Sequence, residues 1–195
     1  MGTLPPPLIL ASTSRYRAEL LHRFGVYFMQ QAPDVDESEL PGETASARAL
    51  RLAVAKAAAI QSPTHAIIIG SDQVSSLHGV IQHKPGDAAA ARAQLRTSSG
   101  QAVMFHTAVC VRDSRTNENY THVDSTEVHF RALDEAEIER YIEREQPLDC
   151  AGSFKCEGLG IALFTHIDSH DPSALIGLPL IALARILRQC GLALP

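Results

Sequence analysis

The sequence contains no tryptophan, and aromatic residues make up only 5% of its 195 residues. It also lacks a long hydrophobic run: the apolar stretch LPLIALA at 178–184 is far shorter than the roughly 18 residues that a membrane-spanning helix needs. The opening MGTLPPPLIL has no basic segment typical of a signal peptide, and Pro6 stands where a myristoylation motif requires Ser or Thr. We therefore expect a cytoplasmic protein with no membrane partner.

Cysteine is scarce and scattered along the chain. The four cysteines form no Cys-x-x-Cys pair, so the sequence shows neither zinc-ligand spacing nor the framework of a small disulfide-rich protein. We expect them to be reduced residues that pack in the interior, as free cysteines commonly do. They are Cys110, Cys150, Cys156 and Cys190.

A surplus of positive charge is also missing. The chain has 17 Lys and Arg residues against 22 Asp and Glu residues, a net charge of −5, which argues against a protein dedicated to binding DNA or RNA. Small phosphate ligands remain compatible with this balance, because a few cations in one place are sufficient for them. The absence of Walker A, GxGxxG and GxSxG motifs disfavours P-loop NTPases, dinucleotide-dependent dehydrogenases and serine hydrolases.

The order of hydrophobic patterns predicts an α/β fold with a mixed β-sheet and flanking helices. A length of 195 residues suits a single domain over 1–195, with residues 1–7 as an extended lead-in. Strands are expected at 8–11, 26–32, 101–112, 120–130 and 161–164, and helices at 15–25, 44–60, 87–96, 133–145 and within 177–191. A further buried strand, from 66, is expected to end in Gly-Ser-Asp at 70–72, before a hairpin through His78-Gly79.

The segment ASTSRYR lies at the expected turn from the first strand to the first helix. Backbone N–H groups at a helix N-terminus, together with Ser12, Ser14 and Arg17, form a natural cradle for an anion. The alternative is that the serines only cap the helix and the arginine lies on the surface.

Asp72 is placed by the expected strand end at an edge of the sheet, where α/β proteins gather their ligand sites. A carboxylate there can bind a divalent cation or accept a proton from water. The alternative is an aspartate that serves only to form a turn.

Several isolated charges have two readings. Lys56, within AVAKA, and Lys84, within HKPG, either extend to solvent or face a phosphate. Glu37, in the acidic loop PDVDE, and Glu157, in GSFKCEG, are solvated carboxylates unless they converge on a metal ion or a nucleobase. The nine histidines show no HExxH or paired spacing and are expected to be structural or surface residues.

Taken together and in this order, the motifs of the chain resemble the Maf family of nucleoside triphosphate pyrophosphatases. The resemblance covers nearly the whole chain, and SDQV, GSFKCEG and an aromatic residue in the first motif are most similar to the branch that acts on 7-methyl-GTP. Arg15 stands where the family usually has Pro, Ala18 replaces a basic residue, and Tyr16 replaces Trp. The motifs are LILASTSRYRAELL, APDVDE, AVAKA, IIIGSDQV, HKPG, AGSFKCEGLG and ALIGLPLIAL.

The resemblance implies a bilobed, ITPase-like fold with a central cleft, and a reaction in which water attacks the α-phosphorus of a nucleotide. It implies a divalent cation, Mg²⁺ or Mn²⁺, held by Glu37 and Asp72, and a homodimer. Asp72 matches the proton acceptor. The phosphate contacts match Ser12, Ser14, Arg17, Lys56 and Lys84, and the base-selecting positions match Tyr16, Gln73 and Glu157.

Tyr16 supports a sharper hypothesis about the substrate. Methylation at N7 gives guanine a positive charge, and an aromatic face attracts a cation. Glu157 adds a carboxylate for the same base; the alternative is that Tyr16 only packs at the start of the helix. Two other functions stay open at this point: the same reaction on UTP, dTTP or CTP, and a non-catalytic interaction protein of cell division.

Overall fold

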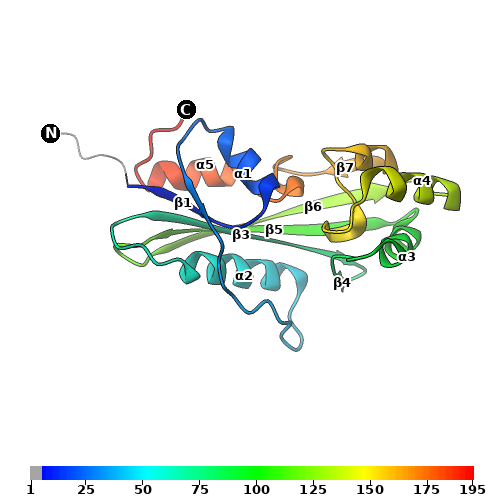
Figure 1. The fold of residues 1–195 in the computed structure, drawn as a ribbon, viewed down its shortest axis with the longest axis horizontal. Coiled ribbons are helices and arrows are strands. Elements are labelled where there is room, and N and C mark those ends of the chain that lie inside the picture. The colour runs from blue at the N-terminus through cyan, green and yellow to red at the C-terminus, as the bar shows by residue number, and fades with distance from the viewer. Residues whose placement is uncertain (1–5) are drawn as a thin grey trace.

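The computed structural model describes residues 6–195, in which seven strands form one mixed sheet (Figure 1). The strands are β1 (Leu8–Ala11), β2 (Met29–Gln31), β3 (Ile67–Leu77), β4 (Val80–Gln82), β5 (Ala102–Asp113), β6 (Asn119–Phe130) and β7 (Phe164–Asp168). Their order is β2-β1-β3-β5-β6-β7, with β4 beside β3. Strand β1 runs parallel to β2 and β3, and the other pairs are antiparallel, so the predicted mixed sheet is confirmed.

Helices cover the sheet as two lobes. The helices are α1 (Arg15–His22), α2 (Ala45–Ala59), α3 (Ala88–Ser98), α4 (Glu135–Glu145) and α5 (Leu180–Gln189). At one end of the sheet α2 packs on one face, and α1 and α5 pack on the other (Figure 1). At the other end α3 and α4 pack with β7 around a second core. The bilobed α/β architecture expected from the sequence is therefore present.

Local signals in the sequence account for most of the helix boundaries. Ser14, Thr44, Asp87 and Asp134 each accept a backbone N–H bond at the start of α1, α2, α3 and α4. Such bonds satisfy donors that a helix cannot satisfy internally. No helix within residues 6–195 is long and apolar enough to cross a membrane. Most of the expected lead-in, residues 1–5, lies outside the described residues.

The strand that carries Asp72 does not end there, contrary to the expectation from the sequence. Strand β3 continues to Leu77, because β5 pairs with it along nearly its whole length and Asp72 lies opposite Ala108. On the other side, β1 stops at Ala11, opposite Gly70, and β4 joins only at Ser75. Asp72 thus lies beside a gap in the sheet because its neighbour ends.

The expected strand at 161–164 is also wrong. Leu159–Leu163 form a 3-10 helix, and β7 begins at Phe164. The preceding chain is coiled rather than extended because Gly160 N–H donates to the Lys155 carbonyl (3.0 Å) and Leu159 N–H donates to the Glu145 carboxylate (2.8 Å).

Candidate active site

A cleft of about 930 Å³ opens between the two lobes, within the size range of small-molecule sites. Residues from both lobes and from both sides of the gap in the sheet line it. All ten residues singled out in the sequence lie on its wall: Ser12, Ser14, Tyr16, Arg17, Glu37, Lys56, Asp72, Gln73, Lys84 and Glu157. They come from six separate segments of the chain, so the fold alone brings them together.

The turn from β1 to α1 forms one end of the cleft. Ser14 accepts the Arg17 N–H at the start of the helix (3.4 Å), and the Ser12 hydroxyl accepts the Ser14 N–H (3.1 Å). Gln30, on β2, donates to the carbonyl groups of Ser12 (2.8 Å) and Ser14 (3.3 Å), which fixes the turn from outside. Ser14 therefore caps the helix, Ser12 holds the turn before it, and both serines line the cleft.

The Arg17 guanidinium is held against the opposite wall. Its Nε donates to the Gly177 carbonyl (2.9 Å), and its Nη1 lies 3.4 Å from the Ser12 hydroxyl. Burial lowers the pKa of Arg17, while the charges of Asp72 and Glu37 act in the other direction. A partly buried guanidinium that lines a cleft is a strong ligand for a phosphate.

Lys56 connects two carboxylates at the centre of the cleft. Its Nζ lies 2.6 Å from Asp72 Oδ1 and 2.8 Å from Glu37 Oε1. Lys56 and Asp72 are both buried, whereas the Glu37 side chain is 55% exposed. Because an ammonium group has three donors, one N–H of Lys56 remains for a phosphate oxygen. Among residues 6–195, no protein donor binds Asp72 Oδ2.

Positive charge surrounds Glu37. Burial alone would raise the pKa of Glu37, but its hydrogen bond to Lys56 and the charges of Lys56, Lys84 and Arg17 bring the pKa below its ordinary value. Glu37 is therefore ionised at neutral pH. Lys84 lines the same cleft.

The donor set of Glu37 and Asp72 fits a divalent cation such as Mg²⁺ or Mn²⁺. Both carboxylates contact the same Lys56 ammonium, so they lie in the same part of the cleft. Mg²⁺ is commonly bound by one or two carboxylates together with substrate phosphates, rather than by a complete protein cage.

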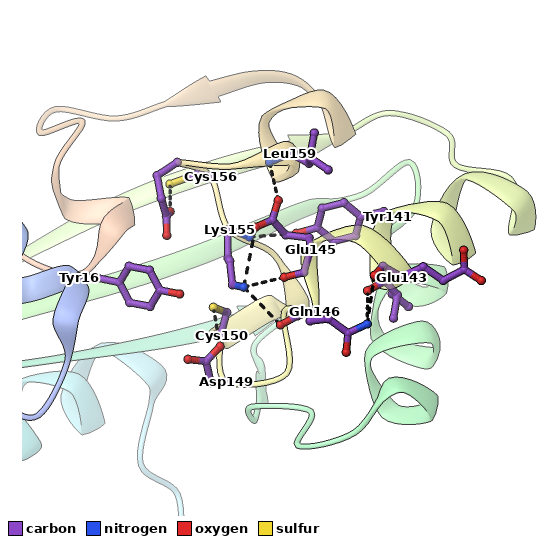
Figure 2. A network of polar contacts seen from close by, with 12 residues as sticks. Tyr16, Tyr141, Glu143, Glu145, Gln146, Asp149, Cys150, Lys155, Cys156 and Leu159 are labelled. Atoms are coloured by element: carbon purple, nitrogen blue, oxygen red, sulfur yellow. Dashed lines mark hydrogen bonds and ion pairs between the residues drawn. The ribbon is translucent and has the colours of Figure 1, made fainter.

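The far end of the cleft has an aromatic and acidic character. Figure 2 shows Tyr16 reaching from α1 toward the segment that carries Asp149, Cys150 and Cys156. Burial raises the pKa of both Cys150 and Cys156 to about 12, so these thiols stay protonated at neutral pH. The negative charge here therefore comes from Asp149 and from Glu157, which also lines the cleft.

Arg15 already occupies part of this end. Its guanidinium lies over the Tyr16 ring, 4.8 Å from the ring centroid, and donates to the Tyr16 hydroxyl (2.8 Å). One face of the ring is thus in contact with a cation of the protein itself.

A polar network fixes the loop that carries Glu157 (Figure 2). Lys155 Nζ donates to the carbonyl groups of Glu145 (2.7 Å) and Gln146 (3.3 Å) at the end of α4, and the Tyr141 hydroxyl accepts the Lys155 N–H (3.0 Å). The Glu145 carboxylate accepts the Leu159 N–H from the other side of Glu157. Both ends of the short segment around Glu157 are therefore attached to one helix.

The Gln73 side-chain amide is already hydrogen-bonded within the protein. Its Nε2 donates to the Thr107 hydroxyl (2.9 Å) and to the carbonyl groups of Ala174 and Leu175 (3.0 Å each). Its amide hydrogens are used within the protein, so Gln73 can offer a ligand only its carbonyl oxygen, which is an acceptor.

Sequence reasoning missed Arg48, Asp149 and Arg15 as residues of the cleft wall. Arg48 donates to the Glu37 carbonyl (2.9 Å) and pairs with Glu39, while Arg51 donates to the Ser38 carbonyl (3.0 Å). Arg48 and Arg51 lie one helical turn apart, shortly after the acidic loop that contains Glu37. This spacing was a signal in the sequence that the two arginines hold the loop.

Comparisons with known proteins find relatives that match nearly the whole chain. A model of the family described as "Maf-like protein" matches residues 7–190. A "7-methyl-GTP pyrophosphatase" of Xanthomonas oryzae pv. oryzae is 56% identical over 192 residues, covering 97% of this chain and all of that protein. Proteins of the same name from Burkholderia lata and Thiobacillus denitrificans are 53% and 54% identical, over 94% and 98% of this chain and 90% and 96% of theirs.

A solved structure supports the fold. The HAM1 protein of Coxiella burnetii is similar with a TM-score of 0.51 over 94% of this chain and 99% of that one, at 16% sequence identity. That likeness concerns the α/β architecture alone, whereas the family match and the relatives extend over nearly the entire sequence. The chain belongs to the Maf family.

Proposed function

We propose that this protein is a nucleotide pyrophosphatase that hydrolyses 7-methyl-GTP to 7-methyl-GMP and diphosphate. The observation that carries the proposal is the cleft itself. One of its ends gathers Arg17, Lys56 and Lys84 around two carboxylates, and the other gathers Tyr16 with acidic side chains. Relatives at 53–56% identity carry the name of this activity.

Asp72 is the proposed proton acceptor for the attacking water. Its Oδ1 is held by Lys56 at 2.6 Å, which orients the carboxylate and leaves Oδ2 for the water. A positioned general base typically accelerates a reaction by about 10²–10⁴-fold. A divalent cation bound to Glu37, Asp72 and the substrate would stabilise negative charge that develops on the phosphates.

The leaving diphosphate needs positive charge, which Arg17, Lys56 and Lys84 supply. Arg17 is fixed by its bond to the Gly177 carbonyl, so its position costs little reorganisation during the reaction. Ser12 and Ser14 lie at the N-terminus of α1 on the same wall, where free N–H groups attract phosphate oxygens.

Selection of the methylated base rests on charge and hydrogen bonding. The Tyr16 ring attracts the cationic purine, and Asp149 and Glu157 add negative charge at the same end of the cleft. Glu157 and the Gln73 carbonyl oxygen are acceptors, which match the N1–H and amino donors of guanine. This arrangement favours 7-methyl-GTP over UTP, dTTP or CTP.

The direct test is diphosphate release from a panel of 7-methyl-GTP, GTP, UTP, dTTP and CTP, with Mg²⁺ or Mn²⁺. We expect 7-methyl-GTP to have the highest kcat/KM and chelation of the cation to abolish turnover. Asp72→Asn should lower kcat by at least about 100-fold, because the general base is lost. Asp34→Asn, in the exposed loop before Glu37 and outside the cleft, is the matched control and should keep full activity.

The same experiment separates the alternatives. A preference for UTP, dTTP or CTP would keep the reaction and replace the substrate. Hydrolysis of none of the nucleotides, or full activity in Asp72→Asn, would contradict the catalytic proposal and favour an interaction protein. The reaction would take place in the cytoplasm, where nucleoside triphosphates are abundant.

A further inference from the structure

A second cluster of ligating side chains lies outside the cleft, on the edge strand β7 and its neighbour β6. His129 pairs in register with His166, and Glu127 pairs with Asp168. Alternate residues of a strand point to the same face, so these two cross-strand pairs place four side chains together on one side of the ribbon. None of the four lines the cleft.

The ligating atoms of this cluster are already close together. His129 Nε2 lies 3.4 Å from Asp168 Oδ2 and 3.7 Å from Glu127 Oε2, and His166 Nε2 lies 3.7 Å from Asp168 Oδ2. The ligand atoms of His129, His166 and Asp168 all lie within 4.8 Å of one another. Zinc bonds of about 2.0–2.2 Å in a tetrahedron separate ligand atoms by about 3.3–3.6 Å, which is close to the spacing of these atoms. Binding would turn the two stacked imidazole rings toward one ion.

A bulge in β7 helps to place the second imidazole. Phe130 pairs with Phe164 and His129 with His166, so Thr165 is an extra residue on β7. The two imidazole rings consequently stack, with centroids 3.9 Å apart and planes 13° apart. Bulges commonly redirect a side chain in this way.

The hydrogen bonds of Thr165 select the nitrogen that faces the cluster. Its hydroxyl donates its only hydrogen to the His129 carbonyl (3.2 Å), and the same oxygen lies 3.1 Å from His166 Nδ1. The hydroxyl must therefore accept from Nδ1–H, which leaves the lone pair on His166 Nε2, the atom that faces Asp168. Metal-binding histidines are usually held by a bond of this kind at the other ring nitrogen.

His129 Nε2 faces both carboxylates of the cluster, Asp168 at 3.4 Å and Glu127 at 3.7 Å. This nitrogen is buried, and neither contact has the geometry of a hydrogen bond. Two adjacent carboxylates and a buried imidazole nitrogen together form an environment for a cation.

We propose that His129, His166 and Asp168, with Glu127 as a fourth ligand, bind a divalent transition-metal ion of the Zn²⁺ class. Two imidazoles and carboxylates suit Zn²⁺, whereas Mg²⁺ prefers oxygen ligands alone, so this site is chemically distinct from the pair Glu37 and Asp72. The ion would join the edge strand to β6. Strand β7 leads directly to the turn at 174–177, whose carbonyl groups hold Gln73 and Arg17 in the cleft.

The test is calorimetric titration of tag-free, chelator-treated protein with Zn²⁺ in the presence of excess Mg²⁺, with the visible absorption of bound Co²⁺ as a second readout. We expect one Zn²⁺ per chain that His166→Gln loses or binds more than about 100-fold more weakly, since even removal of a ligand's supporting partner costs 10–100-fold. The His166 side chain is 55% exposed, so this variant should fold, and circular dichroism checks that it does. Zn²⁺ should also raise the melting temperature of the natural chain and not that of His166→Gln.

Two further variants make the outcome decisive. His65→Gln is the matched control, because His65 also faces a carboxylate, Asp113 at 3.0 Å, but has no second imidazole beside it. It should bind Zn²⁺ as the natural chain does, and so should Asp72→Asn, which alters only the cleft. Equal Zn²⁺ stoichiometry and affinity in the natural chain and His166→Gln, or no Zn²⁺ binding to either, would overturn the proposal.

Discussion

Tyr16 and Arg15 are two adjacent residues with opposite expected effects on the same ligand. Tyr16 presents an aromatic ring to the acidic end of the cleft, and Arg15 places its guanidinium over that ring. A cationic purine would be attracted by the ring and repelled by the guanidinium. Substrate choice therefore depends on the balance between these two side chains as well as on their presence.

Removal of the Tyr16 ring should affect the methylated nucleotide selectively. We expect Tyr16→Ala to reduce kcat/KM for 7-methyl-GTP about 2- to 30-fold more than kcat/KM for GTP, which is the range of a cation–π contact. Tyr16→Phe keeps the ring and should stay close to the natural protein. Equal losses on both nucleotides would show that Tyr16 only packs at the start of α1.

Arg15 is predicted to weaken binding of the cationic base. Arg15→Ala should lower KM for 7-methyl-GTP about two- to five-fold, and KM for GTP should change less, because only the methylated base is positively charged. The difference should shrink at high salt, since Arg15 is exposed and its charge is screened. An unchanged or higher KM for 7-methyl-GTP would contradict this prediction.

Asp124 on β6 is a buried carboxylate near Asp171. Burial and the charge of Asp171 raise the pKa of Asp124 above the ordinary value of 3.8. The folded state therefore binds the proton more strongly than the unfolded state, and stability falls as the pH rises from 3.8 through the raised pKa. Above that pKa the ionised carboxylate destabilises the fold.

Asp124→Asn should accordingly raise the melting temperature at pH 7 and make no difference well below pH 3.8, where the carboxylate is neutral in both states. The amide oxygen can still accept the Thr126 hydroxyl. Asp36→Asn is a control that should change the melting temperature at pH 7 in the opposite direction, because hydrogen bonds from Ser38 lower the pKa of Asp36. A lower melting temperature for Asp124→Asn at pH 7 would refute the argument.

Among the secondary-structure elements, the contact between β3 and α2 positions the catalytic pair. Asp72 lies on β3 and Lys56 on α2, so their 2.6 Å contact depends on how these two elements pack. Gly70 permits their close approach: a Cβ at Gly70 would lie 2.2 Å from the Ala53 carbonyl oxygen and 2.6 Å from the Ala57 nitrogen. In the sequence, Gly70 was expected near the end of its strand, but in the structure it lies within β3 at the contact with α2.

Gly70→Ala should destabilise the protein by about 1–3 kcal/mol, the usual cost of overpacking, and should lower kcat by separating Lys56 from Asp72. Urea unfolding and diphosphate release measure the two effects. Ala57→Gly in the same chain should not rescue either one, because the nearest atoms belong to the α2 backbone. An unfolding midpoint equal to that of the natural protein would show that the helix can move away freely.

The sequence predicts elements well where the signal is local. The cap at Ser14 and the turn through His78 and Gly79, which both have positive φ, lie where the sequence pattern places them. The predicted end of β3 and the predicted strand at 161–164 were both wrong, because each element depends on contacts with a distant part of the chain. Pairing with β5 keeps β3 extended beyond Asp72, and the bond from Leu159 N–H to Glu145 on α4 holds the chain before β7 in a coiled conformation.

For the whole molecule, the net charge of −5 describes the surface rather than the site. Arg17, Lys56 and Lys84, separated by up to 67 positions in the sequence, line one cleft, where carboxylates accompany them. This local concentration of charge suits a small triphosphate and does not require a basic protein. The absence of a nucleic-acid partner remains a prediction from composition.

The homodimer implied by the family resemblance is a prediction at the same scale. Sedimentation equilibrium of the purified chain should give a mass near twice the 21.1 kDa of one chain. The same measurement with His166→Gln shows whether the zinc-class site contributes to association. A monomer at concentrations where the enzyme is fully active would show that one chain carries a complete cleft.

The sequence by itself determined the α/β class and most helix starts, because caps and hydrophobic periods are local in the chain. Its motifs also indicated ten residues that line the cleft. Only the tertiary structure decided that Lys56 pairs with both Glu37 and Asp72. It likewise decided that the Arg15 guanidinium lies over the Tyr16 ring, and that the Gln73 amide donates to carbonyl groups of the turn at 174–177. It also decided that His129 and His166, 37 positions apart, stack across β6 and β7. The reason is physical: strand register and helix packing bring distant residues within bonding distance, and no short stretch of sequence specifies either one.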